Sequence, residues 1–113
     1  MNNAEKLQEI EITIAESKKA IELMESLQRL TNNADFKKVM LDGYFGEECI
    51  RLVLLKGDYE MRDEDQQSQI LKSIDAIGHT RAYFRTIMQV GTQVSRDLGP
   101  DEATQEELLA EQL

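Results

Sequence analysis

The sequence has very little proline, cysteine, histidine or tryptophan, and each shortage excludes a class of structure. Its 113 residues include one proline, Pro100, one cysteine, Cys49, one histidine, His79, and no tryptophan. Proline breaks helices because it lacks a donor N–H, so nothing of this kind interrupts helices before Pro100. A single cysteine cannot form an intrachain disulfide, and we therefore expect a reducing, intracellular origin.

The same shortages bear on catalysis and metal binding. A zinc or di-iron site draws on several His, Cys or carboxylate ligands, and the chain contains no Glu-x-x-His pair. Residues 58–65 are acidic, but they include Arg62 and lack the glycine and closing glutamate of a calcium loop. Asp75 and His79 lie four residues apart, which favours a structural pair or a partner-facing histidine over an acid–base dyad. We therefore predict no enzyme activity, no cofactor and no metal.

Long apolar runs and clusters of basic residues are also absent. The longest apolar run, residues 52–55, is far shorter than the roughly 20 residues that span a bilayer, so we expect no membrane segment. No basic-then-apolar leader is visible, and no secretory signal is expected. The net charge is −9, and residues 99–113 hold five acids and no base. Nucleic-acid binding needs clustered Lys and Arg, so direct nucleic-acid contact is not expected; the acidic tail suits a basic protein partner.

Hydrophobic periodicity predicts an all-α fold with helices at about 4–30, 34–56 and 63–97, in a helical domain of residues 1–98. The first helix carries a heptad seam of alternating three- and four-residue steps at Leu7, Ile10, Ile14, Ile21 and Met24, with Ser17 in its polar position. Residues 31–33 supply capping side chains before the second helix. The second helix has a predicted apolar face at Phe36, Val39, Met40, Ile50, Val53 and Leu54.

Two glycines, Gly43 and Gly46, lie inside this second helix, although each costs about 1 kcal/mol relative to alanine. Two interpretations stay open. The glycines let a neighbouring backbone approach closely, or they form a hinge near Tyr44 and Phe45. We prefer the first.

The third predicted helix begins after an Asp63 cap and ends at Gly99 and Pro100. It carries two adjoining apolar stripes, the first at Ile70, Ile74, Ile77, Phe84, Met88, Gly91 and Leu98, the second at Ala76, Tyr83, Ile87, Val90 and Val94. Two stripes are too wide for one partner helix, so this helix should touch two neighbours. We predict a three-helix antiparallel bundle or an extended helical hairpin with coiled-coil-like seams, which self-associates. Residues 99–113 are predicted as a mobile acidic tail that forms at most a short helix.

The candidate protein-interface residues combine arginines and aromatics of the third helix with two leucines of the tail: Arg81, Tyr83, Phe84, Arg85, Leu108 and Leu109. Arg81 and Arg85 are four residues apart, where like charges weaken a helix by a few tenths of a kcal/mol. Arginine next to aromatic residues is typical of interface hot spots. Two alternatives are that each arginine pairs with an acid on another helix, or that a small ligand lies between protomers near Arg81, Tyr83 and Arg85.

Three stretches carry a resemblance: DFKKVMLDGYFGEECIRLV at 35–53, SIDAIGHTRAYFR at 73–85 and DEATQEELLAE at 101–111. Together they resemble a group of small acidic helical proteins encoded by tailed bacteriophages, often among head and tail assembly genes. The resemblance covers most of the chain and implies a virion component or assembly helper in the host bacterial cytoplasm. It implies phage structural proteins or a host protein as partners, and no catalytic residues.

From these observations we expect a non-enzymatic, oligomeric helical module in phage structure or assembly. The alternative is a phage-encoded acidic inhibitor of a host enzyme or defence complex, with carboxylates that imitate nucleic acid. Acids are mixed with bases everywhere except in residues 99–113, which weighs against the inhibitor.

Overall fold

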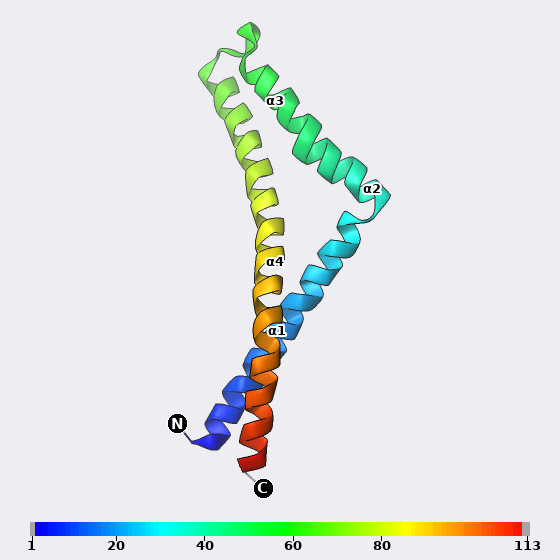
Figure 1. The fold of residues 1–113 in the computed structure, drawn as a ribbon. Helices are drawn as coiled ribbons and strands as arrows, with labels where there is room; N and C mark the ends of the chain where they lie inside the picture. The colour runs from blue at the N-terminus through cyan, green and yellow to red at the C-terminus, as the bar shows by residue number, and fades with distance from the viewer. Residues whose placement is uncertain (1, 112–113) are drawn as a thin grey trace. The chain divides into compact units, whose positions relative to one another are not determined.

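The computed structural model describes residues 2–111, and these form helices joined by short turns (Figure 1). The helices are α1 (Asn3–Thr31), α2 (Ala34–Phe36), the π-helix η1 (Lys37–Glu47), α3 (Glu48–Lys56), the 3-10 turn η2 (Tyr59–Met61) and α4 (Glu64–Glu111). No strand occurs within this described range, so the all-α prediction is confirmed.

Polar side chains cap the helix starts. At the start of α1, the Asn2 side chain accepts a hydrogen bond from the Glu5 amide at 2.8 Å, and the Glu5 carboxylate accepts one from the Asn2 amide at 3.4 Å. Asn33 caps α2 through the Phe36 amide at 2.9 Å. The predicted cap at Asp63 is present, with the Gln66 amide donating to its carboxylate at 3.2 Å. These bonds satisfy amides that have no partner inside the helix.

The chain divides into two compact units. The first unit contains the described residues of Met1–Leu27 and Thr86–Leu113, and the second contains Gln28–Arg85. Helices α1 and α4 contribute residues to both units. In each unit one part of α4 packs against a segment from earlier in the chain.

In the first unit, α1 and the second half of α4 run antiparallel. The Asn3 side-chain amide donates to the Glu111 carboxylate at 2.8 Å, and the Lys18 ammonium lies 3.9 Å from the Glu102 carboxylate. Every residue of the heptad seam predicted for α1 is buried or half-buried, including the polar Ser17. Opposite this seam, α4 presents buried or half-buried residues at Ile87, Gly91, Val94, Leu98 and Leu108.

The two helices approach each other closely at Gly91. A Cβ atom built on Gly91 would lie 2.5 Å from the Met24 Cβ and 2.6 Å from its sulfur, distances that real Cβ atoms essentially never show. By contrast, the only atoms near the Cβ positions of Gly43 and Gly46 are carbonyl oxygens of their own helix. Among residues 2–111, the close packing predicted at Gly43 and Gly46 is therefore not observed, and close packing occurs at Gly91 instead.

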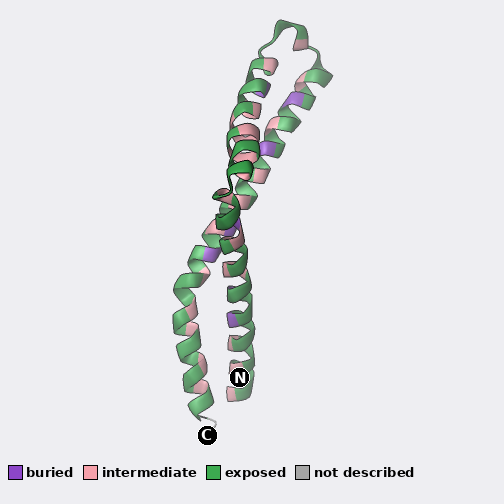
Figure 2. Ribbon diagram, turned by 90° about the vertical axis from the view of Figure 1, so that its right-hand side faces the viewer, coloured by how far each residue is buried: buried purple, intermediate pink, exposed green. Residues whose placement is uncertain are grey.

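The second unit packs α3 and η1 against the first half of α4. Its buried core is Leu52, Ile70 and Ile77, and around it lie Tyr44, Phe45, Cys49, Leu55, Met61 and Ile74. The turn between α3 and α4 is fastened by the Gln67 side chain, which donates to the carbonyls of Lys56 at 3.0 Å and Met61 at 2.6 Å. Few residues are buried, and along each helix they are separated by exposed or half-buried ones (Figure 2).

The π-helix η1 decides which side of the second predicted helix faces inward. Phe36 and Phe45 both contact the Phe84 ring, with centroids 6.1 and 5.7 Å away. Nine residues make about 2.5 turns of an α-helix, which would put these rings on opposite sides. A π-helix has roughly 4.4 residues per turn, so nine residues make about two turns and both rings face α4.

The apolar face that we predicted for this helix is only partly correct. Phe36 and Met40 are half-buried, but four members are exposed, Val39, Ile50, Val53 and Leu54, with exposed fractions between 61% and 70%. The residues that face the core are the other set, among them Phe45, Cys49 and Leu52. An α-helical period was assumed where the backbone is wound more widely, so the predicted face was rotated away from the core.

Helix α4 does not end at Gly99 and Pro100 as predicted, but continues to Glu111. Pro100 cannot donate a hydrogen bond to the carbonyl four residues earlier, which ordinarily breaks a helix. Contacts with α1 continue beyond Pro100, where the Glu102 carboxylate lies 3.9 Å from the Lys18 ammonium and the Glu111 carboxylate accepts a hydrogen bond from Asn3 at 2.8 Å. The Thr104 hydroxyl also donates to the Pro100 carbonyl at 3.0 Å. Residues 112–113 of the predicted tail lie outside the described residues.

Candidate protein interface

The predicted interface residues of α4 lie in the second unit and have different surroundings. Phe84 is half-buried, and its ring contacts those of Phe36, Phe45 and Tyr83. It therefore packs inside the unit. Tyr83 is 59% exposed. Arg81 and Arg85 are exposed, and within residues 2–111 neither guanidinium forms an ion pair with an acid, so the alternative of intrachain pairing is not observed.

The predicted interface residues of the tail lie in the first unit. Leu108 is half-buried against α1, where it lines a shallow hollow with Lys6, Ile10 and Thr13. Leu109, its neighbour, is 45% exposed. Leu108 thus belongs to the packing of α4 on α1, and Leu109 is the one of the two available to a partner.

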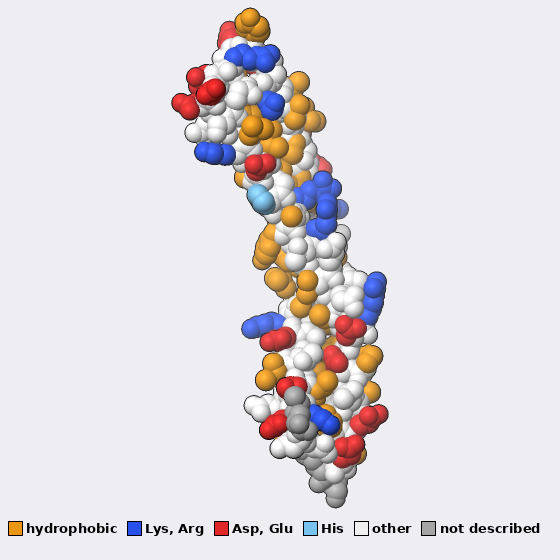
Figure 3. All heavy atoms as spheres, turned by 90° about the vertical axis from the view of Figure 1, so that its left-hand side faces the viewer, with side chains coloured by type: hydrophobic (Ala, Val, Ile, Leu, Met, Phe, Trp, Pro, Cys, Tyr) orange, Lys and Arg blue, Asp and Glu red, His pale blue; other side chains and the backbone are white. Residues whose placement is uncertain are grey.

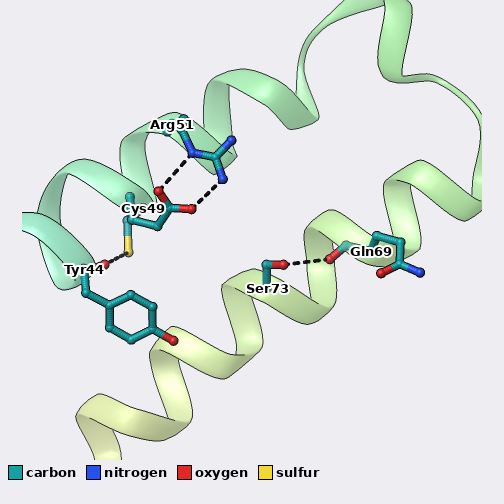
Figure 4. Close-up of polar contacts among 6 residues, drawn as sticks. Tyr44, Cys49, Arg51, Gln69 and Ser73 are labelled. Atoms are coloured by element: carbon teal, nitrogen blue, oxygen red, sulfur yellow. Dashed lines mark hydrogen bonds and ion pairs between the residues drawn. The ribbon is translucent and has the colours of Figure 1, made fainter.

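The other residues considered for chemistry are not assembled into a site. Asp75 and His79 are both exposed, and no hydrogen bond or ion pair joins them in the part of the chain that the structure describes. The half-buried Cys49 thiol lies 4.0 Å from the Tyr44 carbonyl, beside the core of the second unit (Figure 4). Between Asn2 and Glu111, no group of three or more His, Cys, Asp or Glu side chains is placed to hold a metal ion.

The most pronounced surface feature is a groove on η1 and α3 that the sequence did not predict. It is open and shallow, with a volume of about 860 Å³, and its lining residues are Val39, Met40, Gly43, Tyr44, Glu47, Glu48 and Arg51. The signal for it was the pair of glycines beside apolar residues that we had placed in the core. Once the π-helix turns those residues outward, they form a surface.

One ion pair lies at the end of this groove. The Arg51 guanidinium donates two hydrogen bonds to the Glu48 carboxylate, at 2.9 and 2.5 Å (Figure 4). These bonds lower the pKa of Glu48 and raise the pKa of Arg51. The Arg51 side chain is 58% exposed and that of Glu48 is 35% exposed, so the pair orients charge at the surface more than it stabilises the fold.

Large apolar side chains are unusually exposed throughout residues 2–111. The buried hydrophobic residues are Ile14, Leu27, Leu52, Ile70, Ile77 and Ile87. The exposed ones are Ile12, Leu23, Leu30, Val39, Ile50, Val53, Leu54, Tyr59, Leu71, Tyr83, Val90 and Leu109. Hydrophobic side chains lie on the surface among acidic and basic ones (Figure 3). Ile50, Val53 and Leu54 are three and four residues apart on α3 and therefore share one side of it, and such a cluster of exposed apolar side chains is typical of an interaction site.

Comparisons with known proteins do not add to this picture. No protein-family model, curated protein or solved structure matches the chain. None of the described helices combines the length and the apolarity that crossing a bilayer requires. The function is therefore argued from the surface and its chemistry.

Proposed function

We propose that this protein is a non-enzymatic helical module that self-associates and binds other proteins, as a structural or assembly component of a tailed bacteriophage. The observation that carries the proposal is the exposure of apolar side chains. Twelve large hydrophobic side chains are at least 45% exposed, while six are buried, among the residues the structure describes. Burying a Val, Leu or Ile side chain stabilises a protein by about 1.5–3 kcal/mol, so association that covers this surface gains free energy, which offsets the cost of bringing two chains together.

The pairing of the helices explains why the apolar surface is left uncovered. Each unit is built mainly from two antiparallel segments, and such a pair covers only one side of each helix. In α4 the buried and half-buried positions follow three- and four-residue steps from Phe84 through Gly91 to Leu108. A seam with this spacing suits coiled-coil-like association, and helices of a second copy would complete a bundle.

The last turns of α4 provide a surface of a different kind. Residues 99–111 carry five acids and no base. Lys18 of α1 lies at the edge of this surface, beside Glu102. Such a one-sign surface attracts a basic partner segment, and the attraction weakens as salt rises.

The bacteriophage setting rests on the resemblance of residues 35–53, 73–85 and 101–111 to small acidic phage proteins. The test is affinity purification of the tagged protein from the infected cell, with mass spectrometry of the bound proteins and of purified particles. Capsid or tail proteins among the partners are expected. A single host enzyme, with the protein absent from particles, would instead support the acidic inhibitor. Sedimentation of the purified chain tests self-association, and a strict monomer at high concentration would contradict it.

A further inference from the structure

The groove on η1 and α3 has a charge pattern that reverses about its central glycine. The Glu48 amide donates to the Gly43 carbonyl, and a Cβ on Gly43 would lie 3.1 Å from the Lys38 carbonyl. Lys38, Gly43 and Glu48 therefore follow one another along the helix axis, one π-turn apart. The cation Lys38 and the anion Glu48 thus lie on either side of Gly43, each five residues away from it.

A second pair of opposite charges is also placed symmetrically about Gly43. Asp35 lies eight residues before Gly43, and Arg51 lies eight residues after it. Asp35, Lys38, Glu48 and Arg51 are thus placed symmetrically about Gly43 with opposite charges at matching separations, whereas Lys37, Asp42 and Glu47 of the same segment have no such counterpart. The four symmetric charges are complementary to themselves when a second copy runs antiparallel to the segment.

Most of these charged groups are available to a partner. The side chains of Asp35 and Lys38 form no hydrogen bond or ion pair within residues 2–111. Glu48 is already bonded to Arg51, but a carboxylate has roughly four acceptor positions and can take a further donor. The lining of the groove includes the apolar side chains of Val39, Met40 and Tyr44, and also Glu47. At its centre Gly43 has no side chain to hold a neighbouring backbone away.

We infer that this groove binds a second copy of the chain, antiparallel, on a two-fold axis that passes beside Gly43. Lys38 of each copy then faces Glu48 of the other, and Asp35 of each faces Arg51 of the other. The apolar lining is covered at the same time. The inference rests on the proposed function, because it names the surface through which the proposed module self-associates.

The test is a charge exchange measured by sedimentation equilibrium. Lys38→Glu and Glu48→Lys each place two like-charge pairs in the proposed dimer, so each should raise the dimer Kd at least about tenfold. Lys72→Glu, on the exposed surface of α4, and Glu60→Lys are the matched controls and should change the Kd less than about twofold. An equimolar mixture of the Lys38→Glu and Glu48→Lys chains should form a heterodimer with nearly the wild-type Kd. In the mixture, opposite charges face each other at both ends of the interface.

A second measurement uses the unmodified chain, so it does not depend on the folding of variants. A carbodiimide joins amines to carboxylates that are in contact, and an equal mixture of isotope-labelled and unlabelled chain separates links between copies from links within one. A Lys38–Glu48 link between copies is expected. A wild-type oligomer that keeps its Kd in both reversals and lacks this link would overturn the inference while the proposed function stands. A monomeric wild-type chain would overturn both the inference and the self-association on which it rests.

Discussion

The contact between Gly91 and Met24 allows a sharp test of how α1 and α4 pack. Gly91→Ala adds one methyl group, placed 2.5 Å from the Met24 Cβ and 2.6 Å from its sulfur. Ordinary contacts between carbon atoms are about 3.5–4.0 Å, so the two helices must separate by roughly 1 Å at this point. The methionine sulfur can rotate away, but its Cβ is attached to the α1 backbone and cannot.

Two effects of opposite sign decide the result. Alanine is a better helix former than glycine by up to about 1 kcal/mol, which would stabilise the variant. Overpacking a core typically costs about 1–3 kcal/mol, and here the clash involves a backbone-attached atom. We expect the clash to dominate, with a net loss of about 1–2 kcal/mol in the free energy of unfolding. In a chain of this size the midpoint of thermal unfolding then falls by about 4–10 °C.

The same substitution elsewhere in α4 provides the control. Gly78 has no atom within 4 Å of the Cβ position, so Gly78→Ala should stabilise the protein by up to about 1 kcal/mol. Both variants are measured by denaturant unfolding followed by far-ultraviolet circular dichroism. Met24→Ala in the Gly91→Ala background removes the sulfur and should recover part of the loss in a double-mutant cycle. Equal stabilisation by Gly91→Ala and Gly78→Ala, or no coupling to Met24, would refute this account of the helix crossing.

Four further substitutions test the remaining features. Pro100→Ala restores a backbone donor in the interior of α4 and should stabilise the protein by up to about 3 kcal/mol in denaturant unfolding. Phe84→Ala removes a ring shared by three aromatic contacts and should cost about 2–3 kcal/mol, while loss of the exposed Tyr83 side chain should cost less than about 1 kcal/mol. Arg51→Ala should raise the pKa of Glu48 toward its ordinary value in an NMR titration. The sign follows because the Arg51 bonds favour the carboxylate, so their contribution is present above the ordinary carboxyl pKa and is lost as the pH falls through the lowered one.

Helices in which the apolar residues recur at a regular spacing were predictable from the sequence. The heptad seam of α1 was correct residue by residue, because a straight helix that faces one neighbour keeps one spacing throughout. The caps at Asn33 and Asp63 were also predictable, since their side-chain oxygens satisfy amides only a few residues away. Local chemistry was enough in these cases.

The other features depend on tertiary packing, which local sequence patterns do not show. Glycine and proline predicted a helix end at Gly99 and Pro100, but the helix and its contacts with α1 continue beyond them. The π-helix was not predicted. The nine-residue separation of Phe36 and Phe45 indicates it only once both rings are known to contact Phe84, and that contact is not visible in the sequence. The groove on η1 was missed for the same reason, since its residues become a surface only after the helix is wound more widely.

Helix α4 was predicted to need two neighbours because its apolar face is too wide for one. In the structure, its first half packs against α3 and η1, and its second half packs against α1. Ile70 and Ile77 of the first stripe pack in the second unit, while Gly91 of the first stripe and Ile87 of the second stripe pack in the first unit. The second stripe is exposed at Ala76, Tyr83 and Val90, which are seven residues apart and therefore lie on one side of the helix, but it is buried or half-buried at Ile87 and Val94. A further helix fits this seven-residue spacing. The width of the apolar face thus argues for a partner even after every intrachain contact has been made.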